Sequence, residues 1–256
     1  MNKYKILLSI FTIIFLVCYC NDFPTRLPEF KKEISVIGVL DTSHQPQKIY
    51  AFYTAKLDDD NESIHSALVE ISSETQKLQF TLGADTLNIR DAPNLRYYFC
   101  DRPETLHVIP EKKYHLRLVT AEGDSVVGET VVPGRFRIIR PAANSVTTVA
   151  QSLIIEWTKS KDAYGYIINL INPPTEYPPG SGNFLYYAPE SYQTKDTTYT
   201  LYRDYGFKNG IYTIRVMAYD KNFHYHYAEG ISSCGVIGGY GVFGSGVIDS
   251  VAFTIE

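Results

Sequence analysis

The sequence predicts an all-β protein built from two tandem β-sandwiches behind an N-terminal export signal. Short runs rich in β-branched and aromatic residues recur from Ile34 to the C-terminus, and turn residues separate them. No segment carries a sustained apolar period of 3.6 residues, which a helix would need. The chain has 256 residues, 21 of them tyrosine and 13 phenylalanine, so it is long enough for two domains with cores of their own.

The first 19 residues have the layout of a lipoprotein-type signal peptide. Two lysines within residues 1–5 precede an apolar run over residues 6–17. A helix of that length spans about 18 Å, well short of the roughly 30 Å hydrocarbon core of a bilayer. These residues therefore suit an export signal better than a permanent membrane span.

A cysteine at the expected cleavage point suggests attachment of a lipid, which would anchor the protein to a membrane. We expect Cys20 to carry the lipid, with Cys18 as the alternative. Asn21 and Asp22 follow Cys20 in a mostly polar tether over residues 20–33, and this tether contains two prolines that suit a strand poorly.

The first sandwich is expected over residues 34–137. Its clearest strands lie at residues 34–40, 49–53, 67–71 and 114–119, and several alternate apolar with polar side chains. The sequence Glu122-Gly123-Asp124 predicts a tight turn into the next strand. An antiparallel sandwich is the simplest arrangement of such strands.

The second sandwich is expected over residues 138–256, with the boundary near Ile138. Apolar residues alternate along residues 153–157, 166–170 and 210–220, which predicts strands with one buried face. Trp157 on an early strand and Tyr212 near the start of a late strand resemble the pattern of fibronectin type III domains. That resemblance implies that Trp157 is buried and that the Tyr212 hydroxyl bonds to backbone at the end of the sandwich.

Two long loops are expected in the second sandwich, at residues 173–190 and 221–246. The first is too rich in proline and glycine for a central strand. Loops on a rigid sandwich can bind a partner, or can fold back onto the sheet, and both roles remain open. The aromatic residues that we predict as ligand or partner contacts are Phe184, Tyr186, Tyr187, Tyr240 and Phe243.

No motif predicts catalysis, a cofactor or a metal ion. Residues 239–244 match Gly-x-Gly-x-x-Gly, but the next predicted element is a strand and not the helix that would hold a phosphate. His224 and His226 would share one face of a strand, yet they lack a recognised ligand spacing. The acidic run of residues 58–62 lacks the alternating spacing of a calcium loop and is interpreted as a hairpin tip. No serine or cysteine has the sequence context of a nucleophile, so we predict that the protein is not an enzyme.

The net charge and the number of cysteines limit the possible functions further. The formal net charge is −4 and the basic residues are scattered, which excludes a nucleic-acid footprint. Cys100 and Cys234 fall in different predicted domains. They could bridge the domains, but we expect each to be a small, partly buried side chain.

The whole chain resembles a family of uncharacterised exported lipoproteins of Gram-negative bacteria, known only as a domain of unknown function. The motifs that carry this resemblance are Thr130-Val-Val-Pro133 and the Gly-Gly-x-Gly-x-Phe-Gly segment of residues 238–244. The resemblance implies an immunoglobulin-like first domain, a lipid-anchored location at the cell outer membrane, and the company of outer-membrane TonB-dependent transporters. We therefore predict a non-catalytic binding or accessory module that holds a transporter, a peptide or a glycan. The alternative is an architectural or adhesive spacer of the cell surface.

Overall fold

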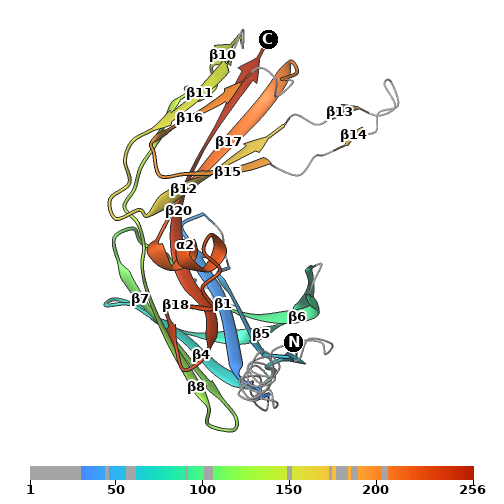
Figure 1. Ribbon diagram of the computed structural model, residues 1–256, viewed down its shortest axis with the longest axis vertical. Coiled ribbons are helices and arrows are strands. Elements are labelled where there is room, and N and C mark those ends of the chain that lie inside the picture. The colour runs from blue at the N-terminus through green and yellow to red at the C-terminus, as the bar shows by residue number, and fades with distance from the viewer. Residues whose placement is uncertain are drawn as a thin grey trace, which may run out of the picture. The chain divides into compact units, whose positions relative to one another are not determined.

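The computed structural model describes residues 30–43, 46–55, 62–89, 92–100, 106–148, 152–172, 175–176, 184–185, 190–202 and 207–256. From Lys32 to Glu256 the chain forms one compact unit, and this unit contains two hydrophobic cores. The prediction of an all-β fold with sandwich-like sheets is confirmed (Figure 1).

The first core is enclosed by strands from the N-terminal half of the described chain. Along β7, Tyr114, Leu116 and Leu118 are buried while the residues between them are exposed, so the period of two places every second side chain inside. The strand β5 pairs with β4 on one side and with β6 on the other. The strands are β1 (Ile34–Asp41), β2 (Lys48–Tyr53), β3 (Glu62–Ser63), β4 (Ala67–Ser72), β5 (Lys77–Ile89), β6 (Ala92–Phe99), β7 (Lys113–Thr120) and β8 (Ser125–Val131).

The second core lies between a three-stranded sheet, ordered β16-β11-β9, and strands ordered β15-β12-β17-β20. Trp157 on β11 is 2% exposed and packs edge-on against Tyr166 of β12, with ring centroids 5.3 Å apart. The strands are β9 (Ile138–Arg140), β10 (Val146–Thr147), β11 (Ser152–Trp157), β12 (Gly165–Ile171), β15 (Glu190–Thr194), β16 (Thr198–Tyr202) and β17 (Gly210–Tyr219).

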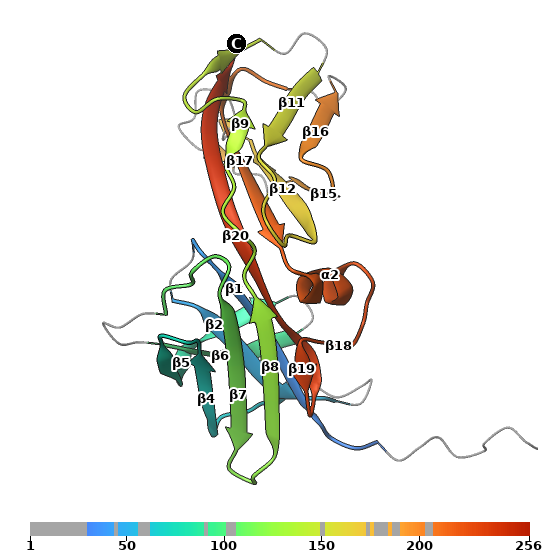
Figure 2. The same cartoon turned by 90° about the vertical axis from the view of Figure 1, so that its left-hand side faces the viewer.

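One strand, β20 (Tyr240–Ile255), belongs to both cores. Its first part pairs in parallel with β1, from Ser35↔Tyr240 to Asp41↔Gly246. Its second part pairs antiparallel with β17, from Tyr219↔Gly246 to Gly210↔Ile255. Figure 2 shows this strand running without a break from one group of strands to the other. The C-terminal segment therefore completes the first core as well as the second.

Our expectation of a long loop at residues 221–246 is wrong. This segment contains helix α2 (Lys221–Tyr227), β18 (Ser233–Cys234), β19 (Val236–Ile237) and the start of β20. The strand β19 pairs with β8, and Val236 enters the first core. The glycines that suggested a loop instead allow neighbouring strands to approach each other closely. A Cβ on Gly241, whose φ is +101°, would overlap the carbonyl oxygen of Val36.

The other predicted loop, at residues 173–190, is described only in part. Within it the described residues form a short antiparallel pair of strands, β13 (Thr175–Glu176) and β14 (Phe184–Leu185).

A buried polar network joins β8, the end of β17 and β20. The Thr130 hydroxyl donates to Oδ2 of Asp220 at 2.6 Å and lies 2.7 Å from Oγ of Ser245. Asp220 also caps α2, since its Oδ1 accepts the backbone N–H of Phe223 at 3.0 Å. Burial raises the pKa of the Asp220 carboxyl, and the hydrogen bonds from Thr130 and Phe223 oppose that rise.

Candidate functional site

A cavity opens where β5 changes its partner. The pairing of β4 with β5 ends at Val69↔Phe80, and the pairing of β5 with β6 begins at Thr81↔Phe99. Because β5 leaves β4 at this point, the two strands separate beside Ala67 and leave a cavity of about 490 Å³. This volume lies within the range of about 300–1,000 Å³ that is common for small-molecule sites.

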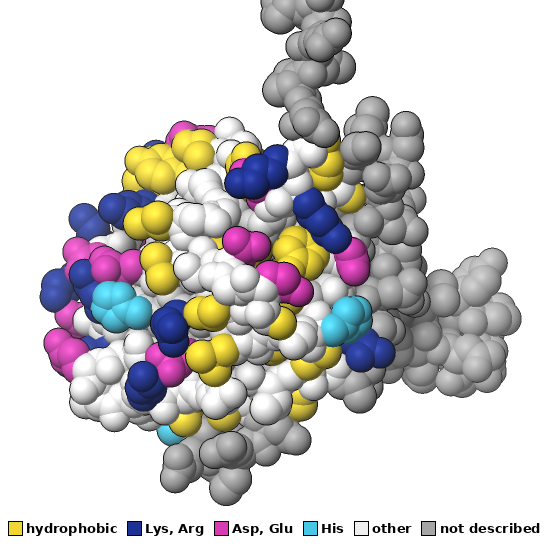
Figure 3. Space-filling view, turned by 90° about the horizontal axis from the view of Figure 1, so that it is seen from below, with side chains coloured by type: hydrophobic (Ala, Val, Ile, Leu, Met, Phe, Trp, Pro, Cys, Tyr) yellow, Lys and Arg dark blue, Asp and Glu magenta, His cyan; other side chains and the backbone are white. Residues whose placement is uncertain are grey.

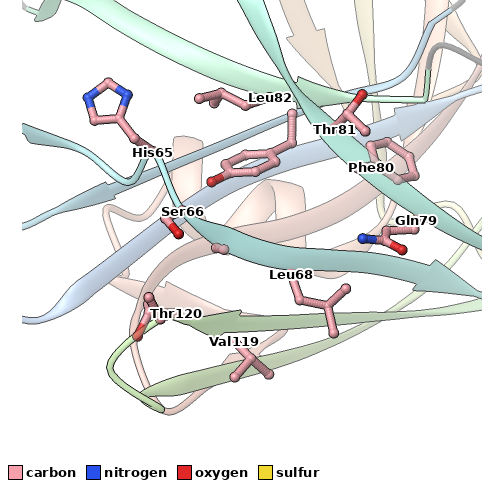
Figure 4. Close-up of a pocket in the computed structure, with 12 residues that line it drawn as sticks. His65, Ser66, Leu68, Gln79, Phe80, Thr81, Leu82, Val119 and Thr120 are labelled. Carbon is pink, nitrogen blue, oxygen red and sulfur yellow. The ribbon is translucent and has the colours of Figure 1, made fainter.

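The lining of this cavity combines apolar side chains with uncharged polar groups. Figure 4 shows them projecting from the segments of β4, β5 and β7 around the opening. Among the described residues of the lining there is no aspartate, glutamate, lysine or arginine, which favours an uncharged ligand or an uncharged segment of a partner. The lining residues are His65, Ser66, Ala67, Leu68, Gln79, Phe80, Thr81, Leu82, Tyr98, Val119, Thr120 and Ala121.

Two buried hydroxyls of this cavity differ in their partners. Tyr98 is 2% exposed and donates to the carbonyl oxygen of Ile64 at 2.7 Å. Burial raises the pKa of Tyr98, so its hydroxyl keeps its proton at neutral pH. Thr120 is 5% exposed, and among the described residues no atom accepts from or donates to its Oγ1. A ligand atom that bonded to Thr120 would remove the cost of that unsatisfied group.

A groove of about 680 Å³ lies on the outer side of β7 and β8, next to β19. Exposed apolar side chains of Val127 and Ile237 line it, together with the charged Glu70, Arg117 and Glu129. Lys113 pairs with Glu129 at 2.7 Å. On the face of the first sandwich seen in Figure 3, basic and acidic side chains alternate with hydrophobic ones, so no charge of one sign dominates it.

Aromatic side chains surround α2. Tyr164 packs against His224 and Tyr225, with centroid distances of 4.5 and 5.5 Å. Phe223 packs against Tyr227 at 4.5 Å. Tyr227 also lines a third cavity, of about 410 Å³, that lies against β1 and β2.

The two structural residues predicted from the sequence both lie in the second core. Trp157 and Tyr212 are each 2% exposed. The Tyr212 hydroxyl accepts from the backbone N–H of Lys208 at 2.8 Å and donates to the carbonyl oxygen of the same residue at 2.9 Å. These two hydrogen bonds close the turn before β17.

The structure describes the side chains of two of the predicted contact residues, Tyr240 and Phe243. Our prediction for Phe243 is wrong, because its side chain is fully buried in the first core. Tyr240 is 41% exposed, and its hydrogen bond with Glu33 raises the pKa of its hydroxyl. Phe184 lies in β14. Tyr186, Tyr187 and the lipidation candidates Cys18 and Cys20 lie outside the described residues.

The histidine pair and the glycine motif occupy other elements than we expected. His224 and His226 lie on helix α2, not on one face of a strand. Besides its aromatic neighbours, His224 lies with Nε2 3.3 Å from Glu229, and Nδ1 of His226 lies 3.1 Å from the carbonyl oxygen of Ile231. Across the part of the chain that the structure describes, no group of three His, Cys, Asp or Glu side chains could hold a metal ion. Residues 240–244 of the glycine motif lie within β20, which continues to Ile255, so a strand and not a helix follows the motif. Residues 58–61 are outside the described ranges.

Cys100 and Cys234 do not form a disulfide, and both are buried. The disulfide between the two predicted domains, which the sequence left open, is therefore not formed in this structure. Burial raises the pKa of the Cys234 thiol, which keeps it in the unreactive protonated form.

The cavities themselves were not foreseen from the sequence. Their lining comes from residues such as His65 and Thr120, which are far apart along the chain and carry no motif. The one available signal was the polar interruption at His65-Ser66 just before a predicted strand. Within the described ranges, no helix has the length and hydropathy needed to span a bilayer.

No protein-family model matches this sequence, and no curated protein sequence matches it either. Among solved structures, the chain is similar to the chicken CNTN1 FN1-FN3 domains, with 10% identity, coverage of 88% of this chain and 64% of that chain, and a TM-score of 0.25. This chain thus spans less than two thirds of that one. Fibronectin(III)-like modules of Clostridium thermocellum CbhA have 14% identity, coverage of 87% and 94%, and a TM-score of 0.22.

A third similar structure contains the two tandem V-type regions of VCBP3, a v-region-containing chitin binding protein. It has 10% identity, coverage of 88% of this chain and 99% of that chain, and a TM-score of 0.21. Superpositions this weak carry no argument about a ligand or an activity. The fold class rests on the strand pairing and the two cores described above.

Proposed function

We propose that this protein is a non-catalytic binding or accessory module of the cell envelope, anchored to the outer membrane by a lipid on Cys20. The observation that supports binding is the open, uncharged cavity between β4 and β5, which a rigid sandwich holds in place. Such a lining can hold an uncharged ligand or partner segment, and its described residues include no aspartate, glutamate, lysine or arginine. An outer-membrane TonB-dependent transporter is the partner class that we propose.

Site-specific photo-crosslinking in cells tests the binding role. A photoreactive residue at the exposed His65, on the rim of the cavity, should capture one dominant envelope protein. The same residue at Ile211, which is 66% exposed on β17, is the matched control and should not capture that protein. Equal capture of abundant bystanders from both positions would contradict the proposal.

The lipid anchor has its own test. Metabolic labelling with palmitate should mark the wild type and the Cys18→Ser variant but not the Cys20→Ser variant. Loss of label only in Cys18→Ser would move the anchor to Cys18. Label that survives both substitutions would end the proposal of a lipid on either cysteine.

A rigid spacer is the second candidate function, and β20 is the observation that favours it. A strand shared by two cores couples them without a flexible linker. Deletion of residues 173–190 distinguishes a binding module from a spacer only if a partner contacts those residues. The crosslinking experiment at His65 is therefore the first test between the two functions. Residues 235–244 are not a suitable deletion, since they contain β19 and the start of the core strand β20.

A further inference from the structure

The third cavity lies on the face of a sheet and not at an edge. Ile37 and Val39 on β1 and Tyr50 on β2 line it. Tyr227, the last residue of α2, also lines it. Since β1 is paired on both sides, with β2 and with β20, no free strand edge is available here for an added peptide strand.

Neighbouring rings hold the two tyrosines of this cavity in place. Tyr50 packs edge-on against Tyr97, with centroids 5.8 Å apart, and Tyr97 is itself 8% exposed. Tyr227 packs against Phe223 at 4.5 Å and edge-on against His226 at 4.9 Å, yet it remains 49% exposed. A ring that is already fixed loses little conformational entropy when a ligand stacks on it.

The polar side chains that line this cavity, Asp41, Gln47 and Lys48, also have partners within the protein that hold them before a ligand binds. The Asp41 carboxylate accepts from the backbone N–H of Ser43 at 2.7 Å and from its hydroxyl at 3.0 Å. The side-chain amide of Gln47 is bonded to the backbone of Asp41 at both ends, at 3.0 and 2.8 Å. The ammonium of Lys48 lies 4.3 Å from the ring centroid of Tyr97.

This combination of groups defines a ligand class. The rings of Tyr50 and Tyr227 offer apolar surfaces, while Asp41 accepts and Lys48 donates hydrogen bonds at the rim. Among the described lining residues, one negative and one positive side chain, Asp41 and Lys48, balance each other, which favours a ligand without net charge. A sugar ring has a C–H face that stacks on an aromatic ring and an edge of hydroxyls that both donate and accept.

We propose that the cavity formed by β1, β2 and the end of α2 binds a neutral saccharide, through stacking on Tyr227 and hydrogen bonds to Asp41 and Lys48. Its volume of about 410 Å³ admits a short part of a glycan chain and not a folded partner. This inference deepens the proposed function, since it gives a ligand class to the binding module. It does not depend on the lipid anchor or on the cavity beside His65.

The test uses the full chain purified in detergent and an array of neutral α- and β-linked gluco-, manno-, galacto- and N-acetylglucosamine oligosaccharides. Saccharides that bind are then titrated by calorimetry. We expect Tyr227→Ala to weaken binding at least tenfold, Tyr227→Phe to change it less than threefold, and Asp41→Asn to weaken it several-fold. Tyr202→Ala removes an exposed tyrosine, 69% exposed on β16, and should leave binding unchanged.

Several results would overturn this proposal. They are binding to no oligosaccharide of the array, equal affinities of wild type and Tyr227→Ala, or displacement of the bound sugar by an uncharged peptide with the same sensitivity to Tyr227→Ala. Circular dichroism of each variant shows whether it is folded. If the alanine variant unfolds, Asp41→Asn keeps the test informative, since an affinity equal to that of wild type would contradict the proposal. A failure here would leave the crosslinking result at His65 untouched, so the two proposals fail separately.

Discussion

Asp220 has an acidic side chain in a buried environment, which aspartate rarely occupies. It is 5% exposed, and it links the first residues of α2 to Thr130 and Ser245. The carboxyl group is hydrogen-bonded at both oxygens, to Thr130 at Oδ2 and to Phe223 at Oδ1. A buried polar group that is satisfied in this way stabilises the fold, whereas the same group without its partners would destabilise it.

We expect Asp220→Ala to lower the free energy of unfolding by about 1–3 kcal/mol, because it removes the cap of α2 and leaves the buried Thr130 hydroxyl with Ser245 Oγ in place of its charged acceptor. Asp220→Asn keeps a cap and a partner for Thr130, so its loss should be smaller. Denaturant unfolding of the two variants and wild type measures both values. Equal stability of the alanine variant and wild type would show that the network adds nothing.

The raised pKa of Asp220 predicts the direction of a pH effect. The folded state holds this proton more tightly than the unfolded state does, where the aspartate pKa is near its usual 3.8. The stabilising contribution is therefore complete below 3.8 and is lost as pH rises through the raised pKa of the folded state. Relative to Asp220→Asn, wild type should lose free energy of unfolding as pH increases over this interval. A difference that stays constant with pH would contradict the assignment.

The two buried cysteines lead to a prediction about reactivity. Cys100 and Cys234 are both buried, so they should resist alkylation in the native protein and react fully after unfolding. Mass spectrometry of peptides alkylated with and without prior reduction should give the same mass for both sites. A site that reacts only after reduction would indicate a disulfide.

At the scale of the elements, β20 depends on a glycine at one position. The parallel pairing with β1 brings Gly241 against Val36, where a Cβ would overlap the backbone carbonyl. The positive φ of +101° adds backbone strain for any other residue.

We expect Gly241→Ala to lower the free energy of unfolding by about 3 kcal/mol or more, since the strand must move away from β1. Gly123→Ala is the matched control, because its φ of +94° is similar but no atom lies near the added Cβ. The free energy of unfolding of this control should fall by about 1 kcal/mol, from backbone strain alone. Similar losses for both variants, measured by thermal or denaturant unfolding, would show that the close approach to Val36 carries no cost.

At the scale of the whole described unit, the shared strand predicts that the two cores unfold together. Gly246 faces Asp41 of β1 and Tyr219 of β17, so neither core can lose β20 without affecting the other. Trp157 reports on the second core and Cys100 on the first.

In a denaturant titration, Trp157 fluorescence and the alkylation of Cys100 should therefore change at the same midpoint. Insertion of Gly-Ser after Gly246 breaks the register between the two parts of β20 and should separate the midpoints. An insertion of the same length after Gly123, in an exposed turn, is the control. Separate midpoints in wild type would show that the cores are independent.

Local alternation made much of the fold predictable. The strands around Tyr114, Trp157 and Tyr212 lie where the period of two indicated, because each strand buries one face whatever its neighbours are. The segment of residues 221–246 was not predictable in the same way. Its glycines are typical of a loop, but they allow close backbone contact within a sheet. The cavity beside Thr120 also had no local signal, since it arises from the change of partner along β5.

The sequence by itself determined the class of this protein, an all-β chain whose alternating side chains require sheets with a buried face. Only the tertiary structure decided that β20 serves two cores, that Asp220 meets Thr130 and Ser245, and that tyrosines of β2 and α2 face one cavity. The physical reason is distance along the chain. Alternation is a property of neighbouring residues, whereas Thr130 bonds to residues 90 and 115 positions away, and such contacts exist only after the strands have paired.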